Sequence, residues 1–251
     1  MELLNNIWSA LTTPNETLIN IILIPSGIIE TLLTLLIFTT ILNLKTNRKQ
    51  KITFIIICSL ISLTNVYFIP SPINTFVNYL SMLIITTFVF KITFLQSLFA
   101  SLISTTIYAL VGTLILNPYY TLFNINSDDL NTVPLYRIIY LLITYFIVFC
   151  ITLILQLKNV KFEIFKSNID KKSKNVLFLN LFIGFVTLCF QAIITIYYTD
   201  TLPIIITFLS FLSLLAYFSV SIYSLTRIIK LDITRQKLQN AEEYNKTLTI
   251  L

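Results

Sequence analysis

The sequence predicts an all-α fold, a polytopic membrane helix bundle of about seven transmembrane helices with a C-terminal cytoplasmic helix. Apolar residues make up 56% of the 251-residue chain and charged residues only 11%, a composition outside the range of soluble domains. The apolar residues gather in seven long runs with short polar connections between them. Of the 17 Lys and Arg residues, all except Arg137 lie in alternate connections or beyond the last run, as loops retained in the cytoplasm do.

Each run is long enough to cross a bilayer, which takes about 20 apolar residues for a hydrocarbon core of roughly 30 Å. The runs lack the two-residue alternation of barrel strands and the polar face of helices in a soluble bundle. The predicted crossings are Pro25–Leu44, Ile52–Ile69, Ile73–Phe90, Ile92–Leu116, Leu135–Leu157, Val176–Tyr198 and Leu202–Leu225.

The charge pattern also predicts an orientation in a cell membrane, with the N-terminus outside and the C-terminus in the cytoplasm. The net charge of +6 does not indicate a nucleic acid partner, because the basic residues are scattered beside the membrane runs. The lysine-rich loop Lys158–Lys174 is interpreted as a cytoplasmic loop lying against anionic lipid. Heavy use of Ile, Asn, Lys, Tyr and Phe suggests an AT-rich genome.

Before the first crossing, residues 1–24 are expected to form an amphipathic segment on the outer leaflet, with Trp8 at the headgroup level. Thr13 is predicted to cap the next helix, and Pro14 and Glu16 suit its first turn. Pro25, followed by Ser26 and Gly27, is expected to kink or restart that helix. On this frame Glu30 lies about one turn from the outer surface.

The remaining connections follow in order. Pro70 and Pro72 flank Ser71 in an outer turn that is too stiff to continue a helix, and Lys91 sits in a very short inner turn. The longest outer connection is Asn117–Val133, which contains Asp128 and Asp129. The sixth crossing rises to the outer turn Tyr197–Asp200. Residues 25–225 thus form the predicted seven-helix domain.

Aromatic residues gather at the outer ends of the predicted helices. An interfacial belt that anchors the helices explains them without a function, whereas a ligand cup would use them as rigid contact area; the two interpretations are compatible for some residues. The residues concerned are Tyr67, Phe68, Tyr119, Tyr120, Tyr136, Tyr140, Tyr197 and Tyr198.

The composition changes at Thr226, and residues 226–251 contain many charged residues and no Pro or Gly. One continuous cytoplasmic helix leaving the last crossing is therefore expected. A heptad frame with a weak, partly polar seam is one interpretation, and a merely solvated helix is the other. The frame places Leu231, Leu238 and Asn245 at position a, and Thr234, Ala241 and Leu248 at position d.

No catalytic signature is visible. The chain has no His, which removes His-based acid–base catalysis and His metal sites, and no cofactor or metal is expected. Within the predicted crossings the polar residues are Glu30, Asn65, Asn78, Gln96, Asn180 and Gln191. The amides are expected to bond between helices. Glu30 could snorkel, form a protonated interhelical bond or contact a substrate.

The stretch Leu214–Leu251, LLAYFSVSIYSLTRIIKLDITRQKLQNAEEYNKTLTIL, resembles the junction in clostridial Agr-type quorum-sensing sensor histidine kinases of the GHKL class. In that family a segment similar to Tyr244–Leu248 leads into the phosphoacceptor histidine region. Ile69–Pro72 and Leu110–Tyr120, LVGTLILNPYY, are similar to the sensor half of the same group. This chain stops before such a histidine, so we expect a truncated sensor module without kinase or ATPase activity, although the family is one of protein-histidine kinases.

The resemblance implies a quorum-sensing peptide pheromone receptor of a two-component system. It would bind a small secreted, often cyclic, extracellular peptide and act as a homodimer or as the partner of a full-length kinase. A response regulator would be reached only through the missing kinase region. Peptide-binding residues are expected at the outer turns, and the C-terminal helix would transmit the signal. The expected peptide-binding residues are Tyr67, Pro70, Pro72, Asn117, Tyr119, Tyr120, Asp128, Asp129, Tyr197, Tyr198 and Asp200, and the signal-transmitting ones are Arg227, Leu231, Leu238, Ala241, Asn245 and Leu248.

Two other functions compete with this one. A small multi-pass transporter would need a water-accessible carboxylate, for which Glu30 is the candidate. A membrane peptidase would need a nucleophile with a base, and Cys58, Cys150 and Cys189 have no His partner. The three cysteines lie inside apolar runs and are interpreted as small core residues.

Overall fold

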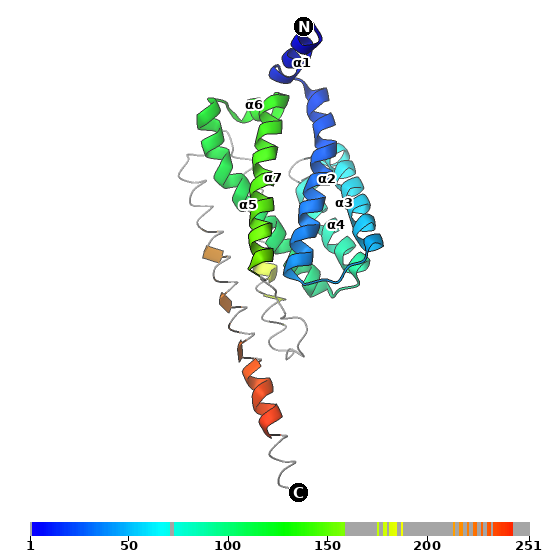
Figure 1. Ribbon diagram of the computed structural model, residues 1–251, viewed down its shortest axis with the longest axis vertical. Coiled ribbons are helices and arrows are strands. Elements are labelled where there is room, and N and C mark those ends of the chain that lie inside the picture. Colours follow the sequence, from blue (N-terminus) through cyan, green and yellow to red (C-terminus); the bar gives the residue numbers. More distant parts are fainter. Residues whose placement is uncertain are drawn as a thin grey trace.

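The computed structural model describes residues 2–70 and 73–158 without interruption. Beyond them it describes residues 175, 178–179, 181–184, 187, 213, 216–217, 220, 223–224, 227, 230–231 and 233–242. Within these residues the secondary structure is helical and contains no strand. The helices pack side by side into an elongated bundle (Figure 1). The chain is therefore an all-α helical bundle, as the sequence predicts.

Four helices of the described residues are long and apolar enough to cross a membrane, namely α2, α3, α5 and α7. A fifth apolar helix, α4, has 18 residues and packs against α3 and α5. These five helices correspond to the first five predicted crossings, which gives the chain the character of a membrane protein. The predicted sixth and seventh crossings, Val176–Tyr198 and Leu202–Leu225, fall mostly outside the described residues.

The N-terminal region forms two helices, α1 (Glu2–Thr12) and α2 (Glu16–Ile41). The predicted amphipathic helix is present as α1, and its Trp8 is 62% exposed. Thr13 does not cap α2 as expected, because its hydroxyl donates to the carbonyl of Ser9 at the end of α1 (2.8 Å). Asn15 caps α2 instead, with its side-chain oxygen accepting from the Leu18 amide (3.1 Å).

Of the two expectations for Pro25, a kink or a restart, the restart is wrong, since α2 continues through this residue. Proline removes one backbone donor from a helix, and neighbouring helices and hydroxyl side chains compensate for this in membrane helices. Beside the proline, the hydroxyl of Ser26 donates to the carbonyl of Leu23 within the same helix (2.9 Å). The first apolar helix therefore begins nine residues earlier than predicted, at Glu16 rather than Pro25.

The next helices are α3 (Arg48–Phe68) and α4 (Ile73–Phe90), the latter with the predicted bounds. Asn47 and Gln50 form a capping box at the start of α3. The connection between α4 and α5 is short because Lys91 adopts a left-handed conformation (φ 54°). Thr93 and Gln96 then form the capping box that begins α5 (Phe94–Phe123).

The expected outer connection Asn117–Val133 is wrong in its first part, since α5 runs through Pro118 to Phe123. Asn124 ends α5 in the left-handed conformation (φ 50°, ψ 47°), which asparagine tolerates better than most residues. A short helix, α6 (Ser127–Thr132), fills the rest of the connection and is capped by Asn126. Helix α7 (Pro134–Leu157) follows with proline in its first turn.

Charge separates the two ends of the bundle. The α6 end comprises the α1–α2 connection, the start of α4 and α6 itself, and it carries Glu16, Asp128, Asp129 and Arg137. The opposite end, here called the lysine end, comprises the α2–α3 and α4–α5 connections and the end of α7 (Figure 1). Its charged residues are Lys45, Arg48, Lys49, Lys51, Lys91 and Lys158.

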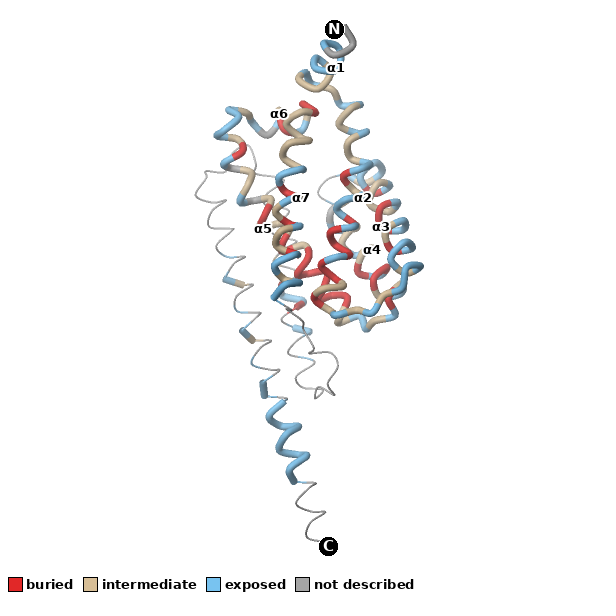
Figure 2. Tube along the Cα trace, in the orientation of Figure 1, coloured by how far each residue is buried: buried red, intermediate tan, exposed pale blue. Residues whose placement is uncertain are grey.

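The tightly packed core lies in the half of the bundle nearest the lysine end (Figure 2). One cluster joins α2, α4, α5 and α7 and contains the fully buried Ile37 and Val148. A second cluster is built on Phe54 of α3, whose ring centroid lies 6.0 Å from that of Phe38 and 5.2 Å from that of Phe90. Dispersion between close-packed side chains stabilises this half, because lipid is as apolar as the helix faces.

Polar side chains join neighbouring helices. The Asn65 amide nitrogen on α3 donates to the Asn78 side-chain oxygen on α4 (2.7 Å), as expected for interhelical amides. Gln50 donates to the Val89 carbonyl (3.0 Å), and Ser97 donates to the Leu83 carbonyl (2.7 Å). Such bonds fix the register of helices whose apolar faces alone would specify it weakly.

The described part of the C-terminal region, residues 233–242, is helical and exposed. This helix lies beyond the lysine end of the bundle (Figure 1). The expectation of a helix after Thr226 is thus met at these positions. Asn245 and Leu248 of the proposed heptad lie outside the described residues.

The amide bond between Asn65 and Asn78 gives a stability prediction. In a double-mutant cycle of Asn65→Ala and Asn78→Ala, we expect a coupling energy of about 0.6 kcal/mol, and at most about 1.7 kcal/mol, as found for hydrogen bonds between membrane helices. The measurement is reversible unfolding in bicelles. Thr64→Ala paired with Asn78→Ala is the control, since exposed Thr64 bonds only within α3. Zero coupling between Asn65 and Asn78 would contradict the role of this bond.

Candidate functional site

A cavity of about 390 Å³ lies between α2, α3, α4, α5 and α7. Its volume falls within the roughly 300–1,000 Å³ typical of small-molecule sites. It extends from Asn74 in the first turn of α4 to Phe54 and Ile85 of the second core cluster. The packed core therefore borders the cavity on the side nearer the lysine end.

Glu30 lies near the middle of α2, 14 residues after Glu16 and 11 before Ile41. At about 1.5 Å per residue, this places it about 21 Å from one end of the helix and about 17 Å from the other. The expectation that Glu30 lies one turn from the outer surface counted the crossing from Pro25, whereas α2 begins nine residues earlier. Glu30 is a carboxylate near the middle of an apolar helix that is long enough to cross a membrane.

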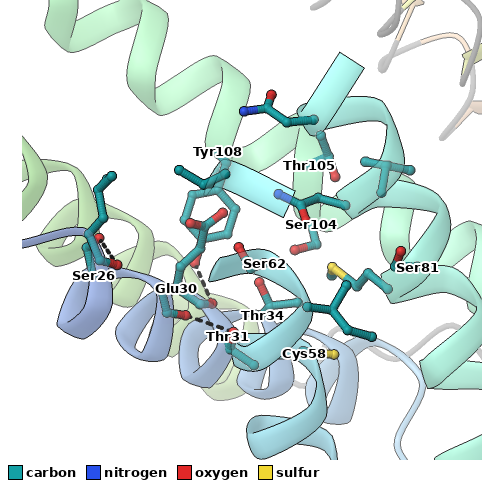
Figure 3. A pocket seen from close by; sticks show the side chains of 18 of the residues that line it. Ser26, Glu30, Thr31, Thr34, Cys58, Ser62, Ser81, Ser104, Thr105 and Tyr108 are labelled. Carbon is teal, nitrogen blue, oxygen red and sulfur yellow. Dashed lines mark hydrogen bonds between the residues drawn. The ribbon is translucent and has the colours of Figure 1, made fainter. Parts of the chain in front are cut away.

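The Glu30 side chain borders the cavity and is exposed within it. Figure 3 shows it facing the polar side chains of α5, which include Ser104, Thr105 and Tyr108. The Tyr108 hydroxyl donates to the backbone carbonyl of Glu30 (3.1 Å) and so positions this turn of α2 against α5. No described residue forms a hydrogen bond or an ion pair with the carboxylate itself. A carboxylate in the middle of an apolar helix, without a protein partner among the described residues, is a candidate functional group.

Arg137 is the second charged residue of the cavity. It lies three residues into α7, at the α6 end. Its Nη1 donates to the side-chain oxygen of Asn131 in α6 (3.2 Å), which orients the guanidinium group. Its Nε is buried and has no hydrogen-bond partner among the described residues. Arg137 and Glu30 line the same cavity, and no ion pair joins them.

Neutral polar groups line the rest of the cavity. Tyr145 of α7 donates to the Ser26 carbonyl (3.2 Å) and so fixes α7 against α2 beside the cavity. The remaining polar lining residues come from all the surrounding helices, and they include Thr31, Thr34, Ser62, Asn74, Asn78, Ser81, Ser104 and Thr105. Hydroxyl and amide groups both donate and accept, so this lining suits a polar ligand. The Cys58 thiol also lines the cavity, and both Cys58 and Cys150 are free.

Metal coordination has no visible basis in the described part of the chain. Residues 2–70, 73–158 and the described positions beyond them contain no group of three His, Cys, Asp or Glu side chains that could hold a metal ion. The two charges and the neutral lining can bind and orient a polar ligand. They do not form a nucleophile with an adjacent base.

The described residues that were predicted to contact a peptide are not among those that line this cavity. Tyr67 is 52% exposed, and its hydroxyl donates to the Asn20 carbonyl of α2 (3.2 Å). Pro70 is exposed, and its carbonyl accepts from the Asn74 amide (3.2 Å). Both residues lie at the α6 end, where they border the approach to the cavity. Whether they touch a ligand stays a prediction.

Tyr119 has a structural role. It is only 2% exposed, and its hydroxyl donates to the Tyr136 carbonyl of α7 (2.7 Å). Its ring centroid lies 4.6 Å from that of Phe123 and 5.7 Å from that of Tyr140. These contacts hold the end of α5 against α7, so Tyr119 is not on the open face of a ligand cup. The Tyr120 carbonyl accepts from the Ile125 amide (3.2 Å) at the end of α5.

The two acidic residues of α6 differ. Asp129 closes the capping box of this helix, since its carboxylate accepts from the Asn126 amide (3.0 Å). Asp128 is exposed, and only its backbone carbonyl is engaged, by the Thr132 hydroxyl (2.8 Å). Asp128 is therefore the acidic side chain of this segment that is available to an external ligand.

Several predicted residues cannot be placed. Pro72, Gln191, Tyr197, Tyr198, Asp200, Asn245 and Leu248 lie outside the described residues, as does the side chain of Asn117. The signal-transmitting candidates Arg227, Leu231, Leu238 and Ala241 lie in helical segments and are exposed. Gln96 was expected within the membrane, but its side-chain oxygen accepts from the Thr93 amide (2.9 Å) at the start of α5. It serves as a helix cap at the lysine end.

Sequence reasoning missed Arg137 as a site residue. The signal was present, because Arg137 is the one basic residue that departs from the alternation of Lys and Arg. Arg137 lies four residues after the predicted outer connection, although basic residues next to membrane helices favour the cytoplasm. Such an exception suggests a specific role for the charge. The structure supplies one by bringing Arg137 to the same cavity as Glu30.

No protein-family model matches the sequence, and no curated protein or solved structure is significantly similar to it. The function is therefore inferred from the geometry of the cavity and from the charge distribution of the bundle.

The cavity predicts different cysteine reactivities at two serines. In a variant with Cys58, Cys150 and Cys189 replaced by Ala, we expect S62C to react with a charged methanethiosulfonate reagent at least about tenfold faster than S97C, because thiol reactivity follows exposure. Ser62 lines the cavity, whereas Ser97 is fully buried in the packed half. The measurement is the labelling rate of the protein in nanodiscs. Equal rates would show that water does not enter the cavity.

Proposed function

We propose that this chain is the transmembrane sensor module of a peptide-responsive two-component receptor. The observation that carries the proposal is the separation of a polar cavity and an exposed helix. The cavity reaches the first turns of α4 and α7 at the α6 end, and the helix over residues 233–242 lies beyond the lysine end. A receptor needs this arrangement, with a ligand site on one side of the membrane and an output element on the other.

The charge distribution supports an orientation with the α6 end outside the cell. Lys45, Lys91 and Lys158 lie at the other end of the bundle together with the helix over residues 233–242. Basic residues next to membrane helices favour the cytoplasm. In the proposed orientation the polar cavity opens toward the extracellular side and the exposed helix enters the cytoplasm. There it would connect to a histidine kinase region, and pairing of two such helices would make a homodimer.

Ligand binding would be coupled to output through helix arrangement. Helix α2 carries Glu30 in the cavity and Ile37 in the packed core, so movement at one level is transmitted along a single rigid element. A ligand shifts such an equilibrium only by its difference in affinity for two arrangements. About 1.4 kcal/mol of this difference suffices for a tenfold change in output.

A small transporter is the second candidate, and one observation favours it. Glu30 lies at central depth and is accessible within the cavity, which is the feature expected of a coupling carboxylate. Against transport, the described helices that line the cavity, including α2, are continuous. Transporter sites are usually formed by helices that break at mid-membrane.

A kinase fusion tests the receptor proposal. When residues 1–251 are joined to the kinase region of a peptide-activated sensor, a library of synthetic cyclic peptides added outside cells should contain members that change phosphorylation of its response regulator. Gln236→Pro should abolish the change, because proline inside a helix costs about 3 kcal/mol. The matched control, Gln236→Ala, should retain it. A response that survives Gln236→Pro would show that the helix over residues 233–242 does not transmit the signal.

Flux measurements decide between the two candidates. In liposomes containing the purified chain and an imposed proton gradient, the receptor proposal predicts no uptake of labelled amino acids or peptides above protein-free liposomes. The transporter candidate predicts uptake that Glu30→Gln removes and that Glu16→Gln, an exposed carboxylate on the same helix, leaves intact. Such uptake would replace the receptor proposal with transport.

A further inference from the structure

We propose that the cavity binds a ligand with both a free ammonium group and a free carboxylate, which is the chemistry of an amino acid or a short linear peptide. The ammonium group would pair with Glu30 and the carboxylate with Arg137. This inference concerns the binding site alone, and it holds whether binding leads to signalling or to transport.

First, the charges of Glu30 and Arg137 are not balanced by other groups among the described residues. The Glu30 carboxylate has no hydrogen-bond or ion-pair partner among the described residues, and the Arg137 Nε is buried without one. An uncompensated charge inside a membrane protein is costly. A simple cation would compensate Glu30 alone, and a simple anion would compensate Arg137 alone. A ligand with both charges compensates both residues at once and adds no net charge to the membrane interior.

The second step is the geometry of Arg137. Its Nη1 is held by Asn131 (3.2 Å), which fixes the plane of the guanidinium group. The edge formed by Nε and Nη2 has no partner among the described residues. An Nε–Nη2 edge binds a carboxylate in a bidentate manner when both donors are accessible. Because Nε is buried here, a carboxylate in the cavity would pair with Arg137 through Nη2, which has no partner among the described residues.

The third step is the separation of the two charges. Glu30 lies at the middle of α2 and Arg137 in the first turn of α7. They line one cavity, and no ion pair joins them. Side chains tilt toward the N-terminus of their helix, so Glu30 points from the middle of α2 toward the α6 end, where Arg137 lies. A compact zwitterion or a short extended peptide can span this gap.

The fourth step is the chemistry between the charges. Ser62, Ser104 and Thr105 line the cavity from α3 and α5. Their hydroxyl groups both donate and accept, as the amide groups of a peptide backbone require. The volume of about 390 Å³ accommodates a ligand of this size, whereas a larger cyclic peptide could insert only a part of itself.

The test uses the full chain in lipid nanodiscs and measures the shift of its thermal unfolding midpoint. The probes are an equimolar mixture of the twenty amino acids, a randomised linear tripeptide library, and the same library with either N-acetylated or C-amidated ends. We expect one of the two unmodified probes to stabilise the protein, and each blocked library to need at least tenfold higher concentration for the same shift. Stabilisation by the amino acids alone identifies a free amino acid as the ligand, and stabilisation by the tripeptides identifies a peptide. If neither unmodified probe stabilises the protein, or if blocked and unmodified libraries act equally, the proposal is overturned.

Charge-removing variants assign each end of the ligand. Glu30→Gln should abolish the preference for a free ammonium group and keep the preference for a free carboxylate. Arg137→Gln should do the reverse. Glu16→Gln and Lys45→Gln, which remove exposed charges outside the cavity, should keep both preferences. The assignment would be overturned if Glu30→Gln or Arg137→Gln abolished the preferences for both the free ammonium group and the free carboxylate. It would also be overturned if either variant kept both preferences.

Glu30→Asp keeps the charge and should keep the ammonium preference, so the assignment remains testable if Glu30→Gln does not fold. If the amino acid mixture is the probe that stabilises the protein, the comparison uses N-acetylated or C-amidated amino acids in place of the blocked tripeptides. Binding is measured here without kinase output or flux. Failure of this inference is therefore distinct from failure of the receptor proposal, which would still stand on a response to external peptides.

Discussion

A polar group that faces hydrocarbon has no water to bind, and this constraint decides how the helices of the bundle are turned. Hydroxyl side chains such as Thr31 and Thr106 donate to carbonyls in their own helices (2.8 and 2.7 Å), and amides such as Asn65 bond to a neighbouring helix. Glu30 and Arg137 are the exceptions, because neither can satisfy its charge within its own helix. The bundle turns both toward one interior space, where they face polar lining rather than lipid. The position of the cavity follows from that requirement.

The two halves of the bundle divide the work between stability and recognition. Toward the lysine end, aromatic and branched side chains such as Phe54 and Ile37 pack without exposure. Toward the α6 end, serine, threonine and asparagine side chains leave room that apolar side chains would have filled. The polar half is less closely packed. The closely packed apolar half holds the helices at fixed separations around the cavity. Helix α2 belongs to both halves, which makes it the element most sensitive to what happens in either.

Periodicity and hydropathy predict the helices well, since the bounds of α4 agree fully and those of α7 differ by one residue. The errors come from proline and asparagine. Pro25 and Pro118 would break helices in water, but both lie inside helices here, and membrane helices tolerate proline better than soluble ones do. The true boundaries are set by Asn15, Asn124 and Asn126, which cap helices or adopt left-handed backbone. The cavity could not be predicted, because pairing Glu30 with Arg137 requires knowing which faces of α2 and α7 meet. Only the anomalous position of Arg137 hinted at it.

Helix α6 is joined to the rest of the molecule on two sides. Asn131 receives a hydrogen bond from Arg137, and the carbonyl of Thr132 accepts from the Asn15 amide at the start of α2 (2.9 Å). Six residues are too few for an independently stable helix, so these bonds help to order it. Replacing this segment with that of another protein would therefore change the orientation of the Arg137 guanidinium group and the first turn of α2. Chimeras that graft foreign residues between Asn124 and Val133 would be interpretable only if the donor keeps an acceptor at position 131 and the helical backbone at position 132.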